Sequence, residues 1–169
     1  TDLALQAALT GHLVFSTLHT SSAAGALPRL IDLGAEPFLL SSTMNAMLGQ
    51  RIVRRICLHC KESYVPVPQI IEEMQKVLGK LFPSNSTIKL YRGKGCEECG
   101  NLGYLGRIGI FEVLPVSNKI ASLILEHPDA ATLEKEAITD GMITMKQDGY
   151  FKALQGITTI EEVIRVAQE

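Results

Sequence analysis

The chain has 169 residues, of which 46% are hydrophobic, 20% are charged and 5% are aromatic. These proportions are typical of a folded protein with an aliphatic core, arranged as one large domain or two small ones. The formal net charge of −2 gives no general attraction to nucleic acid, which proteins bind through clustered Lys and Arg. No apolar run reaches the roughly 18 residues that a membrane-spanning helix needs.

The N-terminal part predicts a helix, a strand and a second helix. Residues 3–8 favour a short helix that ends near Gly11, because glycine tolerates the positive φ of a helix C-terminus. Residues 12–19 (HLVFSTLH) have the length of a strand, with apolar side chains on both faces, as in a sheet covered by helices on both sides. The hydroxyl side chains of residues 20–22 can cap a helix that reaches about residue 33, although Pro28 should kink it or delay its start.

The next residues predict another helix and another strand. The helix begins at Pro37 and extends to about residue 49, and residues 51–57 (RIVRRIC) have the composition of a strand. Strand, helix, helix and strand in this order, with short connections, predict half of a parallel sheet. Residues 1–56 are therefore assigned to an α/β domain.

The chain contains four cysteines in two pairs of the same spacing, Cys57-x-x-Cys60 and Cys96-x-x-Cys99. Two such pairs complete a tetrahedral shell of four thiolates, which is closed to water and therefore structural, and this ligand set indicates zinc. Two alternatives stay open: disulfides or a redox-active pair, and a site that no longer binds metal. Zinc with four thiolates carries a net charge of about −2, so cations are expected nearby. Candidates for these cations are Arg54, Arg55 and Arg107.

The cysteine pairs bracket further predicted elements, and residues 57–114 are assigned to a zinc-binding insert with its return strands. Residues 70–81 carry apolar side chains at helical spacing and predict an amphipathic helix that packs on the metal lobe. Residues 87–91 and 106–114 are strand-like.

Beyond Pro115 the pattern is helical, and residues 115–169 are assigned to an all-helical subdomain. Ser117 and Asp129 can each cap a helix, and a third helix covers about residues 144–154. The motif Thr159-x-x-Glu162 predicts a capping box for the last helix.

Several stretches of the chain strongly resemble the ATPases of bacterial type II secretion and type IV pilus assembly. They are GHLVFSTLHTSSAAGALPRLIDLGAEPFLLSS (residues 11–42), GQRIVRRICLHC (49–60), GCEECGNLGYLGRIGIFEVL (95–114) and QGITTIEEVIRV (155–166). Several separate motifs in the right order are far more specific than one alone. The resemblance covers almost the whole chain.

The resemblance implies an α/β fold, namely the C-terminal part of a RecA-like P-loop NTPase domain that forms a homo-hexamer and hydrolyses ATP with Mg²⁺. It also implies that the chain begins just after the Walker B segment, as a fragment of a longer protein. The Walker A loop, GxxxxGK[ST], is not in the sequence. Its phosphate-binding N–H groups, Lys and Mg-binding hydroxyl are therefore missing. We expect the intact protein to be an ATPase and this chain alone to be inactive.

The resemblance also indicates candidate site residues, because residues 11–20 resemble the family's His box. His19 is the candidate sensor of the γ-phosphate, since it ends the predicted strand where open α/β sheets bind ligands. His12 is a second candidate, with the alternative that it caps the preceding helix or hydrogen-bonds within the sheet. Gln50 and Arg51 are further candidates for nucleotide or subunit-interface contacts. Arg29 is a candidate for contact with a neighbouring subunit, with a solvated helix face as the alternative.

Partners and location follow from the same resemblance. The zinc lobe is expected to contact an adjacent subunit or an inner-membrane platform protein of the secretion or pilus machinery. The protein is expected in the cytoplasm, peripherally associated with the inner membrane, without nucleic acid. These residues do not separate type II secretion from type IV pilus assembly. The alternative function is a non-catalytic zinc-ribbon module that binds protein or nucleic acid.

Overall fold

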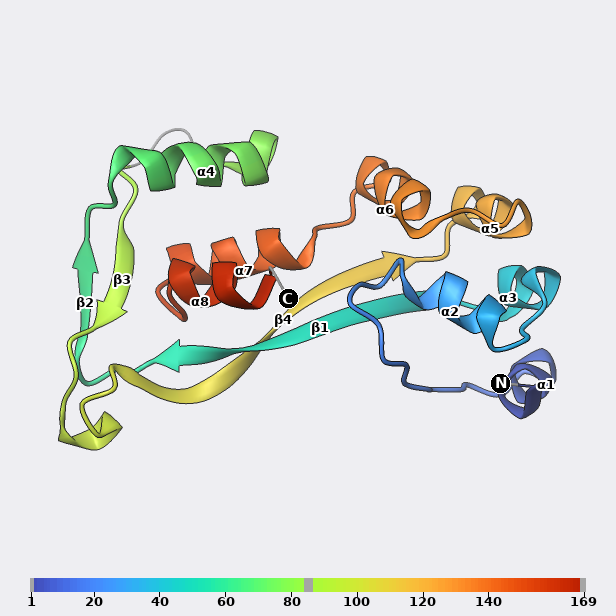
Figure 1. The fold of residues 1–169 in the computed structure, drawn as a ribbon, viewed down its shortest axis with the longest axis horizontal. Coiled ribbons are helices and arrows are strands. Elements are labelled where there is room, and N and C mark those ends of the chain that lie inside the picture. Colours follow the sequence, from blue (N-terminus) through green and yellow to red (C-terminus); the bar gives the residue numbers. More distant parts are fainter. Residues whose placement is uncertain (1, 84–86, 168–169) are drawn as a thin grey trace. The chain divides into compact units, whose positions relative to one another are not determined.

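The structure is a computed structural model that describes residues 2–83 and 87–167. Packing divides the chain into two compact units, the first from residues 1–49 and 112–143, the second from residues 50–111 and 144–169. The boundary falls within two long strands, β1 (Ala46–Ile56) and β4 (Tyr104–Pro115), which pair in a two-stranded sheet and whose arrows point in opposite directions (Figure 1). The three-segment division made from the sequence stays a prediction.

The first unit is built from short helices around an aliphatic core. Ser117 and Asp129 cap α5 and α6 as predicted, each accepting a hydrogen bond from the backbone N–H three residues on. Leu27, Leu40 and Leu114 are among the fully buried side chains of this core. The helices are α1 (Asp2–Leu9), α2 (Ala26–Asp32), α3 (Pro37–Thr43), α5 (Asn118–Leu125) and α6 (Ala130–Thr139).

The second unit combines a small sheet with helices. Strands β2 (Lys61–Tyr64) and β3 (Leu90–Gly93) are antiparallel, with Lys61 opposite Gly93. Met74, Tyr150 and Val163 are buried in its core. The helices are α4 (Pro68–Leu78), α7 (Met145–Leu154) and α8 (Ile160–Ala167), with two single 3₁₀ turns, η1 (Gly79–Leu81) and η2 (Glu97–Cys99).

The predicted strand over residues 12–19 is wrong. The segment has no regular secondary structure and runs as an irregular connection between α1 and α2 (Figure 1). Leu13 and Phe15 are 76% and 88% exposed. A strand exists only where a neighbouring strand accepts and donates its hydrogen bonds, and none pairs with this segment among the described residues. The predicted half of a parallel sheet is wrong for the same part of the chain.

The boundaries of two other predicted elements shift. The helix that begins at Pro37 ends at Thr43 instead of residue 49, because Met44 turns to extended backbone and β1 begins at Ala46. Pairing with β4 overrides the local preference for helix there. Pro28 delays α2 as predicted, since the helix begins only two residues before it.

Candidate functional site

The cysteine pairs converge at one end of the second unit. Cys57 follows β1, Cys60 precedes β2, and Cys96 and Cys99 flank the 3₁₀ turn η2. Their four sulfur atoms all lie within 4.8 Å of one another. All four cysteines are free thiols, so the structure contains no disulfide between them.

The sulfur spacing fits a tetrahedral metal site. The Sγ–Sγ distances are 3.8 Å for Cys57–Cys96, 3.9 Å for Cys60–Cys99 and 3.7 Å for Cys96–Cys99. A tetrahedron of thiolates about 2.3 Å from zinc has edges of about 3.8 Å. The residues present therefore fit a four-thiolate zinc ion, with no position left for water or substrate.

Backbone N–H groups point at the sulfur atoms. Cys60 Sγ accepts a hydrogen bond from Gly95 N (3.3 Å), and Cys99 Sγ accepts from Cys96 N (3.3 Å) and Gly103 N (3.2 Å). Burial raises the pKa of the Cys99 thiol, but the N–H groups of Cys96 and Gly103 outweigh it and lower the pKa to about 6. These N–H groups therefore favour thiolate at Cys99, and thiolate is the form that binds metal.

The two knuckles are held together by a close backbone crossing. Cys57 N donates to Gly103 O at 3.0 Å, and Lys94 N donates to Cys60 O at 3.0 Å. Gly103 has φ +76, and a Cβ built there would lie 2.6 Å from Gly93 O. Gly93 and Gly103 therefore both have to be glycine, because a side chain on either would collide with the backbone of the other. Gly103 also needs glycine for its positive φ.

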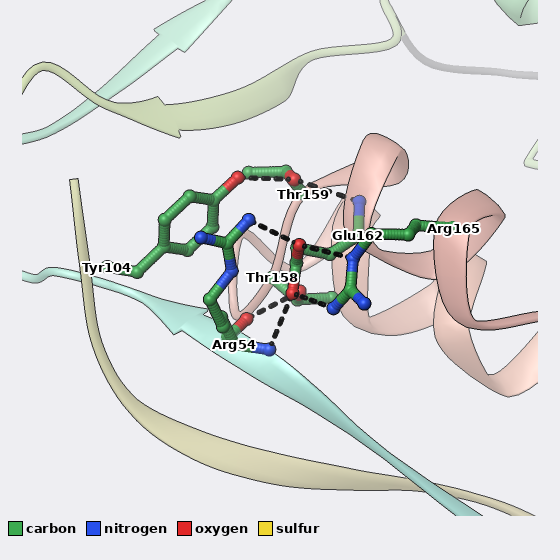
Figure 2. A network of polar contacts seen from close by, with 6 residues as sticks. All are labelled: Arg54, Tyr104, Thr158, Thr159, Glu162 and Arg165. Carbon is green, nitrogen blue, oxygen red and sulfur yellow. Dashed lines mark hydrogen bonds and ion pairs between the residues drawn. The ribbon is translucent and has the colours of Figure 1, made fainter. Parts of the chain in front are cut away.

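Arg54, one of the cations predicted near the metal lobe, is paired with a carboxylate in the structure. Its guanidinium donates to Glu162 Oε1 at 2.6 Å and lies 4.2 Å from the centroid of the Tyr104 ring, as Figure 2 shows. Glu162 is 2% exposed. It also accepts hydrogen bonds from Arg54 N and from the Arg165 guanidinium. Arg54 thus joins β1 to α8.

The same network explains why the predicted capping box is only half formed. Glu162 N donates to Thr159 Oγ1 at 3.3 Å, as a capping box requires, and the Tyr104 hydroxyl lies 3.0 Å from the same oxygen (Figure 2). The Glu162 carboxylate, however, is hydrogen-bonded to Arg54 and Arg165. Two guanidinium groups carry full positive charges and a backbone N–H does not, so the carboxylate is held more strongly by the arginines than by the helix end.

The structure distributes the predicted nucleotide-site residues over both units. His12, His19 and Arg29 lie in the first unit, and Gln50 and Arg51 lie in the second. His12, His19, Arg29 and Gln50 are exposed, and Arg51 is half-buried. Because residues 12–19 are not a strand, His19 does not lie at the end of a strand, which was the position predicted for it.

His12 sits at the C-terminal end of α1. Thr10 Oγ1 donates to Ala7 O at 2.8 Å and lies 2.9 Å from His12 Nδ1. The threonine proton is used on Ala7, so Thr10 Oγ1 accepts from the ring N–H of His12. This is the helix-end position that was the structural alternative for His12.

Glu112 and Tyr104 are two residues that the motif analysis missed. Glu112 is 6% exposed on β4 and accepts a hydrogen bond from Ala23 N at 2.6 Å. Its signal in the sequence is a single acid within the apolar strand pattern of residues 108–114. Tyr104 carried no such signal, since its contacts depend on Arg54 and Thr159, which are distant in the chain.

Within the described part of the chain, none of the helices has the length and apolar character required to cross a bilayer.

The fold and the thiol cluster define an α/β protein with a candidate structural metal site, and known proteins share this architecture. The X-ray structure of the Legionella pneumophila ATPase DotB matches 99% of this chain and 35% of that chain, with a TM-score of 0.59 and 19% identity, so the two share a fold. Residues 1–165 match the family described as Type II/IV secretion system protein. The chain belongs to this family.

Relatives from both kinds of system are similar to the chain. It is 45% identical over 162 residues to the type IV pilus assembly ATPase PilB of Thermus thermophilus, covering 96% of this chain and 18% of that protein. It is 45% identical over 168 residues to type II secretion system protein E of Pseudomonas aeruginosa, covering 99% of this chain and 32% of that protein. The chain thus spans about a third or less of the length of these relatives.

Proposed function

We propose that the chain is part of a hexameric ATPase that hydrolyses ATP to power type II secretion or type IV pilus assembly. The match of residues 1–165 to the secretion family carries this proposal. The relatives named as ATPases support it. Relatives of both systems are equally similar, so the proposal covers both. Within the intact protein, this chain supplies the His box, the metal lobe and helices.

In this proposal the tetracysteine cluster binds one zinc ion. Cys57, Cys60, Cys96 and Cys99 hold it through their sulfur atoms, and the ion supplies a rigid cross-link and no reaction chemistry. The sulfur spacing and the N–H groups directed at sulfur support this assignment. Sulfur–sulfur distances of 3.7 to 3.9 Å between unbonded thiols argue against structural disulfides.

The nucleotide is proposed to meet this chain through its first unit. His19 senses the γ-phosphate of ATP, and the neighbouring hydroxyls of residues 20–22 are available to orient it. Arg29, Gln50 and Arg51 remain candidates for nucleotide or subunit contacts. The P-loop, which belongs to a RecA-like core and holds the phosphates and Mg²⁺, is proposed for another part of the intact protein.

The proposed setting is the cytoplasmic face of the inner membrane. The metal lobe is a platform for a neighbouring subunit or for the membrane platform protein of the machinery.

The test of this function is ATP hydrolysis by the intact protein carrying His19→Ala. We expect kcat to fall about tenfold or more, the usual scale for losing one group that stabilises the transferring phosphate. His127→Asn is the control, because His127 is exposed with φ +54, which Asn tolerates. If the intact wild-type protein does not hydrolyse ATP, the proposed function is wrong. If it does and kcat is unchanged in His19→Ala, only the proposed role of His19 is wrong.

A further inference from the structure

We infer that Glu112 is a positioning residue for His19, because its carboxylate holds the turn formed by residues 20–25, which joins His19 to α2. The inference rests on the proposed function only for the role of His19. Ala23 N donates to Glu112 Oε1 at 2.6 Å, across 89 positions of sequence. Ala23 and Glu112 are 2% and 6% exposed. A hydrogen bond to a buried carboxylate is one of the stronger kinds.

The turn itself is closed by local hydrogen bonds. Thr20 Oγ1 donates to Ser22 O, and Gly25 N donates to Ser22 Oγ, both at 3.1 Å. Ala26 N donates to Ala23 O at 3.1 Å and begins α2. These contacts define the shape of the turn but do not place it on the rest of the unit. Two features do: Ala23 and Ala24 are buried in the core of the unit, and the bond from Ala23 N to Glu112 attaches the turn to β4 in one direction.

The Glu112 carboxylate occupies the space that a side chain at Gly49 on β1 would fill. A Cβ at this position would lie 2.8 Å from both Cγ and Oε1 of Glu112 and 3.0 Å from Ala23 N. Three segments of the first unit therefore converge at one point: β1 at Gly49, β4 at Glu112 and the turn at Ala23. Such a contact admits one arrangement of the side chain, because packed interiors tolerate little displacement.

The position of Glu112 in its strand argues against a role in stability alone. Ile110, Glu112 and Leu114 alternate along β4 as its buried positions, and both aliphatic residues are 0% exposed. An aliphatic side chain at the middle position would satisfy burial at no cost of desolvation, whereas a buried carboxylate carries such a cost. What the carboxylate adds is a directed bond to one backbone N–H, which fixes the position of the turn.

The consequence concerns His19, four residues before Ala23. Without the bond, the turn keeps the burial of Ala23 and Ala24 but loses its one directed polar attachment to β4, so the backbone that carries His19 is held less precisely. Misplacement of a positioned group lowers the rate of the chemical step more than it lowers substrate binding. The effect is therefore expected in kcat, with KM nearly unchanged.

The experiment compares Glu112→Ala with Glu112→Gln in the intact protein. Glutamine keeps an oxygen that can accept from Ala23 N, so it separates the hydrogen bond from the charge. In Glu112→Ala we expect kcat to fall about tenfold with KM changed less than about twofold, and amide exchange in residues 20–26 to accelerate about tenfold. Glu112→Gln should recover most of both. The exposed Glu126→Ala is the matched control.

Each other outcome decides against some part of the inference. Unchanged amide exchange of residues 20–26 in Glu112→Ala would overturn the attachment of the turn. Accelerated exchange with unchanged kcat would overturn the positioning role, while His19→Ala in the same assay reports separately on the proposed function. If Glu112→Ala does not fold, Gly49→Ala serves instead, because its methyl group displaces the carboxylate without removing it. It should reproduce both effects.

Discussion

At the scale of single residues, two glycines decide whether the cysteine knuckles can meet. A Cβ at Gly93 would collide with the backbone of Gly103. We expect Gly93→Ala to lower the free energy of unfolding of the zinc-loaded protein by about 2 kcal/mol or more, since backbone cannot yield as a side chain does. Gly100→Ala is the control, because Gly100 has φ +57 but nothing within 4 Å, so only its backbone preference of about 1 kcal/mol is lost. Urea unfolding measures both, and equal losses would contradict the steric argument.

The cysteines carry the second prediction at this scale. We expect one zinc ion per chain, and its loss in Cys99→Ser, because this sulfur accepts two backbone N–H groups and completes the tetrahedral shell. Elemental mass spectrometry of freshly purified protein measures the stoichiometry. Ser41→Ala, distant in the chain, is a control that should retain the metal. A folded protein with four reactive thiols and no metal would contradict the site.

At the scale of elements, one carboxylate attaches α8 to β1. Burial raises the pKa of Glu162, but its bonds to Arg54 and Arg165 outweigh this and lower the pKa to about 2, from an ordinary value of 4.5. The stabilisation is therefore complete above about pH 4.5 and is lost as the pH falls towards 2. Both arginine side chains are about half exposed, so losing these charged hydrogen bonds costs about 2 kcal/mol, less than for a fully buried pair.

The corresponding prediction compares the pH dependence of two variants. Glu162→Gln should be less stable than the wild type by about 2 kcal/mol at pH 7, and the difference should shrink below pH 4.5. Metal loss in acid affects both proteins, so the difference in free energy of unfolding is the quantity to measure. The neighbouring Glu161→Gln, which is exposed, should show no such trend. A difference that stays constant down to pH 3 would contradict the assignment.

At the scale of the whole molecule, the missing phosphate-binding loop predicts inactivity. We expect no ATP hydrolysis by this chain alone, because nothing in its sequence matches GxxxxGK[ST], whose backbone, Lys and hydroxyl hold the phosphates and Mg²⁺. Phosphate release by the chain, measured beside the intact protein, checks this. The prediction is wrong if the chain alone hydrolyses ATP and His19→Ala abolishes that activity, since the phosphate site would then be complete without the loop.

Features that depend on neighbours in sequence were readable from the sequence. The caps at Ser117 and Asp129 are confirmed, because a cap is a contact between a side chain and a backbone group three residues away. The pairing of the two Cys-x-x-Cys motifs into one cluster was also readable, since two identical knuckles suit one tetrahedral ion. The family followed from several motifs in order, and residues 1–165 match it.

Features that depend on partners distant in the chain were decided by the tertiary structure. Residues 12–19 have strand composition but no pairing strand among the described residues. Residues 46–49 leave a helical pattern to pair in β1, and Glu162 binds Arg54 instead of completing its own helix cap. Glu112 shows the same principle, since its partner Ala23 lies 89 residues away. Composition and periodicity describe what a segment can do, but a ladder bond or a buried ion pair needs a second group, and only the folded chain brings that group near.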